Sequence, residues 1–261
     1  DLTVDSSTTS ALVFSAAMAG VATITGGTFT ATTAAQASMY FVDDITGTLS
    51  VSDATLTSSS TAFFTSTGKT ISGSISLTNV AATATATNHA LLFTGMASAA
   101  ITVLGGSYSG IAATIRFVSA VDAGTTVNIK AGTGLTVASS GGSAVAFSAA
   151  VAGTVAVSGG TFTSTTPGEA AMYFVDDITG TVSVSGATLS ASSSAFYTTS
   201  GKTLSGSITL TNVAATATAT KHALGFTGMA SATITIYGGS YSGVGAGIHF
   251  ETAIDAGTTV K

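Results

Sequence analysis

The sequence contains no cysteine and no tryptophan, a single proline and few charged residues. Without cysteine there are neither disulfide bonds nor thiolate metal sites, so backbone hydrogen bonds and side-chain packing must hold the fold together. Only 7% of the 261 residues are charged, against roughly 25% in an ordinary globular domain. Helices need Glu, Lys and Arg on their exposed faces, whereas the abundant Thr, Ser, Val and Gly of this chain favour tightly turned β-structure. We therefore expect an all-β protein.

Two further shortages limit the classes of function. Six Lys and Arg residues against eleven Asp and Glu residues give a formal net charge of -5, and no basic cluster is available to bind phosphates. No apolar run approaches the roughly 18 to 20 residues of a membrane-spanning helix. The sequence opens at Asp1 without an initiator methionine, as expected of an exported protein after signal-peptide removal. We expect an extracellular or cell-surface protein that binds no nucleic acid and does not insert into a membrane.

The sequence repeats itself with a period of 133 residues. Residues 41–47, Phe-Val-Asp-Asp-Ile-Thr-Gly, return unchanged 133 positions later at 174–180, and residues 122–127 return at 255–260 with the same offset. A constant offset means that no insertion separates the two copies. We therefore expect a first half, residues 1–133, that continues directly into a second half, residues 134–261.

A shorter unit recurs within each half. One aromatic residue marks each unit, at spacings of 23 to 30 residues; these residues are Phe14, Phe41, Phe64, Phe93, Phe117, Phe147, Phe174, Tyr197, Phe226 and Phe250. Further along each unit, two alternating apolar residues precede a third, as in Ile101, Val103 and Tyr108. This alternation predicts strands with one inward face, which such units bury only by stacking on their neighbours. The sequence predicts a parallel β-solenoid of about ten coils, with the ten aromatic residues as a core ladder.

The coil pattern resembles that of a known structural class. Residues 24–29, Ile-Thr-Gly-Gly-Thr-Phe, are similar to the coils of right-handed parallel β-helices, which include pectate-lyase-like enzymes and the passenger regions of bacterial adhesins and autotransporters. The resemblance implies a right-handed solenoid in a secreted protein. Residues 88–90, Asn-His-Ala, and 128–130, Asn-Ile-Lys, depart from the Gly-His-Gly and basic motifs of the pectin-hydrolysing members. We therefore expect no enzymatic activity.

Asp43 and Asp44, repeated as Asp176 and Asp177, are the adjacent carboxylates of the chain. Paired carboxylates serve as acid and base in glycoside hydrolysis, and they also bind calcium. The accessory Asn, His, Arg and Lys groups of a hydrolase site are missing. We interpret the pair as solvent-facing turn carboxylates, with a calcium site as the weaker alternative.

The three histidines give no stronger signal. His89 and His222 occupy equivalent positions of the two halves, and His249 directly precedes Phe250. None has a second histidine nearby in the sequence, and cysteine ligands are absent. We interpret all three as loop or stacking imidazoles, and we expect neither a metal nor a cofactor.

Hydroxyl side chains flank the third apolar position of most units, as Thr28 and Thr30 do around Phe29. With Phe29 inward, the flanking hydroxyls point outward in register, which is the arrangement expected of an ice-binding face. The pattern is interrupted at Ala81 and Ala214. The alternative interpretation is that Thr and Ser suit exposed strand positions in general.

Both ends of the chain fall at nearly the same point of the long repeat. Residues 1–4 align with 134–137 and residues 260–261 with 127–128, so a second molecule placed after the first continues the solenoid with only five positions missing. We find no polar cap in either terminal segment, and open solenoid ends favour edge-to-edge pairing. A head-to-tail contact that does not close generates a filament.

We therefore expect a structural subunit of an extracellular filament, sheath or surface layer, whose partners are copies of itself. The predicted interface residues are Asp1, Leu2, Thr3, Val4, Thr259, Val260 and Lys261. A repeat segment of a secreted adhesin is the alternative.

Overall fold

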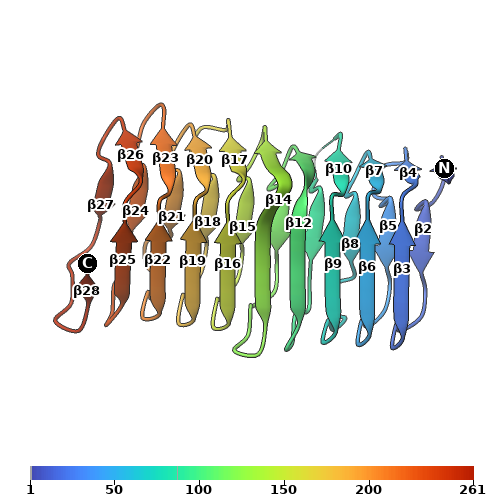
Figure 1. Ribbon diagram of the computed structural model, residues 1–261, viewed down its shortest axis with the longest axis horizontal. Helices are drawn as coiled ribbons and strands as arrows, with labels where there is room; N and C mark the ends of the chain where they lie inside the picture. Colours follow the sequence, from blue (N-terminus) through green and yellow to red (C-terminus); the bar gives the residue numbers. More distant parts are fainter. Residues whose placement is uncertain (1, 87) are drawn as a thin grey trace.

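The computed structural model describes residues 2–86 and 88–261, which form 28 β-strands and no helix (Figure 1). Every strand pair is parallel, and the coils follow one another along the long axis of the molecule. This confirms the predicted all-β, parallel β-solenoid of about ten turns. None of the residues in these two ranges belongs to a helix that is long and apolar enough to cross a membrane.

The strands stack in three columns. The first column contains β3 (Val21–Thr25), β6 (Thr48–Ser52), β9 (Ser74–Thr78), β16 (Thr154–Ser158), β19 (Thr181–Ser185), β22 (Ser207–Thr211), β25 (Thr233–Tyr237) and β28 (Thr259–Val260). The second contains β1 (Thr3–Ser6), β4 (Thr28–Ala31), β7 (Thr55–Ser58), β10 (Ala81–Ala84), β17 (Thr161–Ser164), β20 (Thr188–Ala191), β23 (Ala214–Ala217) and β26 (Ser240–Gly243). The long strands β12 (Ala100–Gly110) and β14 (Thr126–Ser139) belong to both columns and join them into one 18-stranded sheet.

The third column is a separate ten-stranded sheet. It contains β2 (Leu12–Phe14), β5 (Met39–Phe41), β8 (Phe63–Thr65), β11 (Leu91–Phe93), β13 (Ile115–Phe117), β15 (Val145–Phe147), β18 (Met172–Phe174), β21 (Phe196–Thr198), β24 (Leu224–Phe226) and β27 (Ile248–Phe250). The core lies between the columns.

Period-two alternation fixes which side of each strand faces the core. In β6, Leu49 and Val51 are fully buried, while Thr48 is exposed. Leu49 lies in register with Ile75 of the next coil and Val51 with Leu77, so each apolar position extends into a ladder along the axis. The coils stack so closely that a side chain at some positions is impossible: a Cβ on Gly73 would overlap the carbonyl oxygen of Gly47.

Ten stacked rings run through the core from end to end. They are Phe14, Phe41, Phe63, Phe93, Phe117, Phe147, Phe174, Phe196, Phe226 and Phe250, with neighbouring ring centroids 4.5 to 5.7 Å apart. The terminal rings Phe14 and Phe250 are partly buried, whereas the eight between them are fully buried. Aromatic rings at these separations attract one another, and this attraction adds to the stabilisation that comes from their burial.

The predicted ladder is wrong at Phe64 and Tyr197. Within β8, Phe63 and Thr65 face inward, and Phe64 is half-buried on the outer side, where its ring stacks on Tyr40 at 5.1 Å. Tyr197 has the corresponding outward place beside Tyr173. Each of these coils carries two adjacent aromatic residues, and a strand turns only one of them to the core.

Tyr108 of β12 carries a buried polar group without a partner. Its side chain faces inward between Ala82 and Val137, and its hydroxyl forms no hydrogen bond with any described residue. Burial raises the pKa of this phenol. Tyr241, the equivalent residue of the second half, instead donates its hydroxyl to the Gly238 carbonyl oxygen at 3.0 Å.

Substitution of Tyr108 by Phe is therefore expected to stabilise the protein. The ring remains while a desolvated, unsatisfied hydroxyl is removed, a change of about 1 kcal/mol or more in the free energy of unfolding. Denaturant unfolding of Tyr108→Phe and Tyr241→Phe measures the contrast, since the second change removes a hydrogen bond. A Tyr108→Phe variant less stable than the parent would show that this hydroxyl is satisfied in solution.

Candidate functional sites

The boundary between the halves shows how one copy of the long repeat stacks on the next. β14 runs without a break from the fifth coil into the sixth, in the middle of the molecule (Figure 1). It pairs with β12 on one side and with β16 and β17 on the other. Val127, Leu135 and Val137 are buried along it. The first half therefore offers the second a complete face of strand edges and apolar side chains.

The residues buried at this boundary have equivalents on the two ends of the molecule. Leu135 is 3% exposed, whereas Leu2, its equivalent 133 positions earlier, is 61% exposed. Val127 is 0% exposed, whereas Val260 is 42% exposed. Identical side chains at identical points of the repeat are thus buried where another copy covers them and open where none does.

The same contrast extends across the C-terminal end face. Ile115, Val121 and Val127 are fully buried in the fifth coil, while their equivalents in the tenth coil, Ile248, Ile254 and Val260, are exposed. At the N-terminal end, Val4, Leu12 and Phe14 are only partly buried. Each end thus presents apolar side chains that a neighbouring copy covers at the internal boundary.

The predicted interface residues lie on these two ends. Thr3 and Val4 lie in β1, with Leu2 just before them; its carbonyl oxygen accepts a hydrogen bond from the Thr28 amide at 2.8 Å. Asp1 lies outside the described residues.

At the other end, Thr259 and Val260 form β28, and the Lys261 amide donates to the Ile234 carbonyl oxygen at 3.0 Å. Within one chain the two groups lie at opposite ends of the long axis (Figure 1). Contact between them therefore requires a second molecule.

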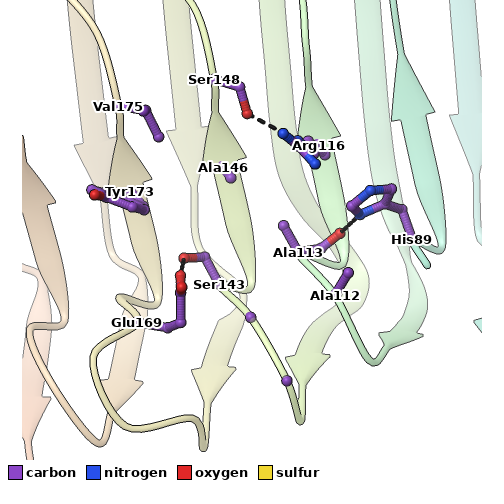
Figure 2. A pocket seen from close by; sticks show the side chains of 12 residues that line it. His89, Ala112, Ala113, Arg116, Ser143, Ala146, Ser148, Glu169, Tyr173 and Val175 are labelled. Atoms are coloured by element: carbon purple, nitrogen blue, oxygen red, sulfur yellow. Dashed lines mark hydrogen bonds between the residues drawn. The ribbon is translucent and has the colours of Figure 1, made fainter. Parts of the chain in front are cut away.

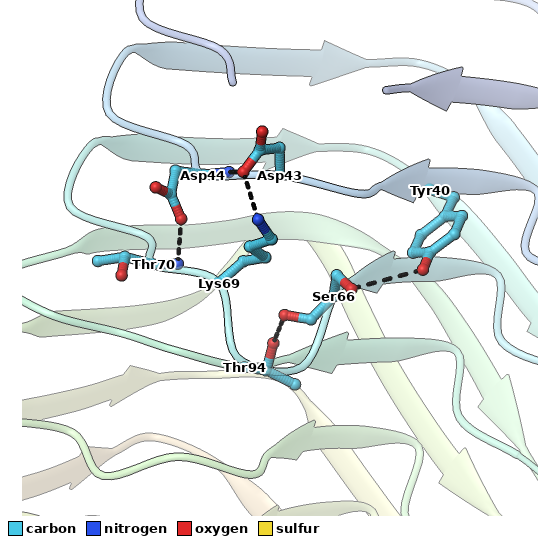
Figure 3. A network of polar contacts seen from close by, with 7 residues as sticks. All are labelled: Tyr40, Asp43, Asp44, Ser66, Lys69, Thr70 and Thr94. Carbon is cyan, nitrogen blue, oxygen red and sulfur yellow. Dashed lines mark hydrogen bonds and ion pairs between the residues drawn. The ribbon is translucent and has the colours of Figure 1, made fainter. Parts of the chain in front are cut away.

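The aspartate pairs link successive coils. The Lys69 ammonium lies 2.8 Å from Asp43 Oδ1, and the Thr70 amide donates to Asp44 Oδ1 at 2.7 Å (Figure 3). In the second half, Lys202 pairs with Asp176 at 2.9 Å, and the Thr203 amide donates to Asp177 at 2.7 Å. The first aspartate of each pair is thus already ion-paired with a lysine of the next coil. Calcium binding at these aspartates stays a hypothesis that requires the lysine to move away.

Asp43 and Asp176 are expected to give a small, pH-dependent stabilisation. Hydrogen bonds from Lys69 and from the Asp44 amide lower the pKa of Asp43 below its ordinary value of 3.8, and Lys202 acts likewise on Asp176. Because the folded-state pKa is depressed, the stabilisation is present at neutral pH and is lost as the pH falls through the lowered pKa. Exposure to solvent keeps it small.

Thermal unfolding of the Asp43→Asn/Asp176→Asn variant measures this effect. We expect a slightly lower melting temperature than the parent at neutral pH and a smaller difference at acidic pH, where the carboxylates of the parent become protonated. The same gap at both pH values would contradict the ion-pair interpretation.

A cavity of about 260 Å³ lies beside the boundary of the halves (Figure 2). His89 Nδ1 hydrogen-bonds the Ala113 carbonyl oxygen, and Arg116 Nε donates to Ser148 Oγ at 2.9 Å. Ser143 donates to Glu169 Oε2 at 2.8 Å. Burial lowers the pKa of His89 and favours its neutral form. Only the Arg116–Ser148 hydrogen bond crosses the boundary, since His89 and Ala113 both belong to the first half and Ser143 and Glu169 both belong to the second.

Hydroxyl groups form a column on the outer side of the second strand column. Thr28 and Thr30 of β4 lie beside Thr55 and Thr57 of β7 in direct register. Alanine interrupts the column at positions 81, 138 and 214. The outward orientation agrees with expectation, but the regular spacing extends over only a few coils at a time.

No family model matches this chain, and no curated protein or solved structure is significantly similar to it. Its function must therefore be argued from its own geometry.

One side-chain cluster was missed by sequence reasoning. His222, His249 and Glu251 place one donor atom each within 4.8 Å of one another on the last coils. His222 and His249 lie on successive coils and are 27 residues apart, although the strands here pair at an offset that places Gly225 beside His249. The general spacing of the coils was thus a signal for this contact, whereas the local register was not visible in the sequence.

Proposed function

We propose that this chain is the structural subunit of an extracellular filament, sheath or surface layer that grows by head-to-tail stacking of solenoids. The observation that carries the proposal is the internal boundary, where one copy of the repeat already stacks on another. The C-terminal face of the tenth coil repeats the face of the fifth, and the N-terminal face of the first coil repeats that of the sixth. Two molecules can therefore meet as the two halves do.

The internal boundary supplies a specific register for the contact between molecules. Ser107 pairs with Thr136, Ile115 with Val145 and Val127 with Val155. Shifting each residue to its equivalent places Ser240 beside Thr3, Ile248 beside Leu12, and Val260 beside Ala22 of the next molecule. Such pairing satisfies the free N–H and C=O groups of both end coils and removes their apolar side chains from water.

Electron microscopy and sedimentation of the purified chain test the proposal. We expect unbranched filaments whose axial repeat is about 48 Å per subunit, since ten coils are spaced at roughly 4.8 Å. Filament mass should increase with protein concentration above a threshold. Monomers at every concentration, or particles associated only side by side, would contradict the proposal. The extracellular location is part of the same proposal and is tested by fractionating the producing cells.

Two alternatives have observations of their own. The internal boundary is also compatible with a repeat segment of a secreted adhesin of the β-helix class, in which neighbouring repeats are joined covalently; the purified chain then stays monomeric. The outward hydroxyl column favours ice binding over the coils where it is regular. Faceted ice crystals grown in the presence of the chain would support that reading.

A further inference from the structure

Two imidazoles and a carboxylate converge on the last two coils. His222 lies just before β24, His249 lies within β27, and Glu251 follows that strand. The imidazole ring centroids are 3.9 Å apart, and one potential ligand atom from each residue lies within 4.8 Å of the other two. These are nitrogen and oxygen donors of the types that bind zinc.

The ligand atoms have few competing partners. The Nδ1 atoms of His222 and His249 are both buried, and neither has a hydrogen-bond partner in the part of the chain that the structure describes. Glu251 Oε1 lies 4.0 Å from His249 Nδ1. Buried nitrogens without partners are costly, and a metal ion between them would remove that cost.

A neighbouring side chain holds one of the carboxylate oxygens of Glu251. The Tyr197 hydroxyl donates to Glu251 Oε2 at 3.2 Å. Such an outer hydrogen bond holds a ligating carboxylate in place.

The first half of the chain lacks this cluster, although it has the same fold at the same place. Where the second half carries His249, Glu251, Tyr197 and Gly225, the first carries Arg116, Val118, Phe64 and Leu92. His89, the equivalent of His222, uses its Nδ1 to bond the Ala113 carbonyl oxygen.

Gly225 makes room for the cluster. A Cβ at this position would come within 2.8 Å of the Tyr197 ring, so the leucine of the first half could not be accommodated without a shift. The second half thus differs from the first at several positions that lie close together, and these differences bring the donor groups of His249 and Glu251 next to His222.

We propose that His222, His249 and Glu251 bind one divalent transition-metal ion, for which zinc is the best match, with Tyr197 positioning the carboxylate. Two histidines and one glutamate are a ligand set that zinc accepts, and they leave a fourth position for water or another ligand. Metal binding would require the three donor atoms, which lie within 4.8 Å of one another, to move closer together. This proposal is independent of head-to-tail assembly, because all three ligands belong to one chain.

Titration with zinc ions alone tests the site by isothermal calorimetry, after treatment with a chelator. We expect one zinc ion per chain for the parent and for His89→Ala, the matched control from the first half. His222→Ala and His249→Ala should each abolish binding, and Tyr197→Phe should weaken it by about tenfold or more. Cobalt ions should give the visible absorption bands of a tetrahedral site in the parent and not in His249→Ala.

Circular dichroism verifies that each variant keeps its β-structure. Absence of zinc binding by the parent, or equal binding by the parent and the His222→Ala/His249→Ala double variant, would overturn the proposal. Loss of binding in His89→Ala would also overturn it, because it would move the metal to the first half. Zinc is counted per chain, so the result does not depend on whether filaments form.

Discussion

Replacing Leu2 and Val4 with lysine is expected to abolish filament growth and to leave the single solenoid folded. Leu2 is largely exposed, and both residues lie on the face that a second molecule would cover. In an assembled junction, two ammonium groups would be buried among apolar side chains, at a cost of several kcal/mol per contact. The other coils keep their own neighbours, so each solenoid retains most of its core.

Two matched variants separate the junction from general effects of charge. Thr3→Lys adds a lysine to the same strand on its outward side and should leave assembly nearly intact. Leu135→Lys/Val137→Lys makes the equivalent change at the internal boundary and should destabilise the fold itself. Pelleting and light scattering give the filament yield, and circular dichroism the folded fraction. Normal polymerisation of the Leu2→Lys/Val4→Lys variant would exclude stacking through these ends.

Truncating Phe63 to Ala is expected to destabilise the protein far more than truncating Phe64. Phe63 is 0% exposed and stacks between Phe41 and Phe93 in the core, so its loss leaves a cavity that costs about 3 to 5 kcal/mol. Phe64 lies on the outer side and loses mainly its contact with Tyr40, about 0.5 to 1.5 kcal/mol. Denaturant unfolding of the two variants measures the difference.

The second half provides an internal repetition of that comparison. Phe196→Ala should resemble Phe63→Ala, because Phe196 continues the ring stack between Phe174 and Phe226. Tyr197→Ala should resemble Phe64→Ala. Equal losses for the two members of either pair would mean that the strand register of β8 or β21 is wrong.

The architecture could be predicted because its determinants are local and repeated. The alternation at Leu49 and Val51 indicates which side of a strand faces the core, and the glycines indicate where the coil turns. The constant 133-residue offset shows that both features recur in the second half, so the same local pattern is repeated over about ten coils. The choice between Phe63 and Phe64 could not be made from spacing, since adjacent residues differ by only one position. The second half offers a clue, because the residue equivalent to Phe64 is Tyr197. A hydroxyl group is tolerated more readily on the outer side of a strand than in a packed core.

The surface sites were harder to predict because they depend on contacts between coils. Asp43 pairs with Lys69, and His222 lies against His249, each across a separation of one coil. A search for nearby residues in the sequence overlooks such pairs. The exact register also decides whether two side chains point the same way, and only the structure supplies it. The end faces were predictable in outline because the repeat shows which residues a neighbouring copy covers.

Oxidative cross-linking of the Thr3→Cys/Ser240→Cys variant tests head-to-tail stacking most directly. The parent chain has no cysteine, so any disulfide joins two of the introduced cysteines. Strand neighbours lie about 4.8 Å apart, within the Cα separations that a disulfide spans. Ser107→Cys/Thr136→Cys, the equivalent pair at the internal boundary, is the positive control and should close within one chain. Stacking predicts a ladder of covalent multimers for the Thr3→Cys/Ser240→Cys variant; a monomer band under conditions that oxidise the control would contradict it.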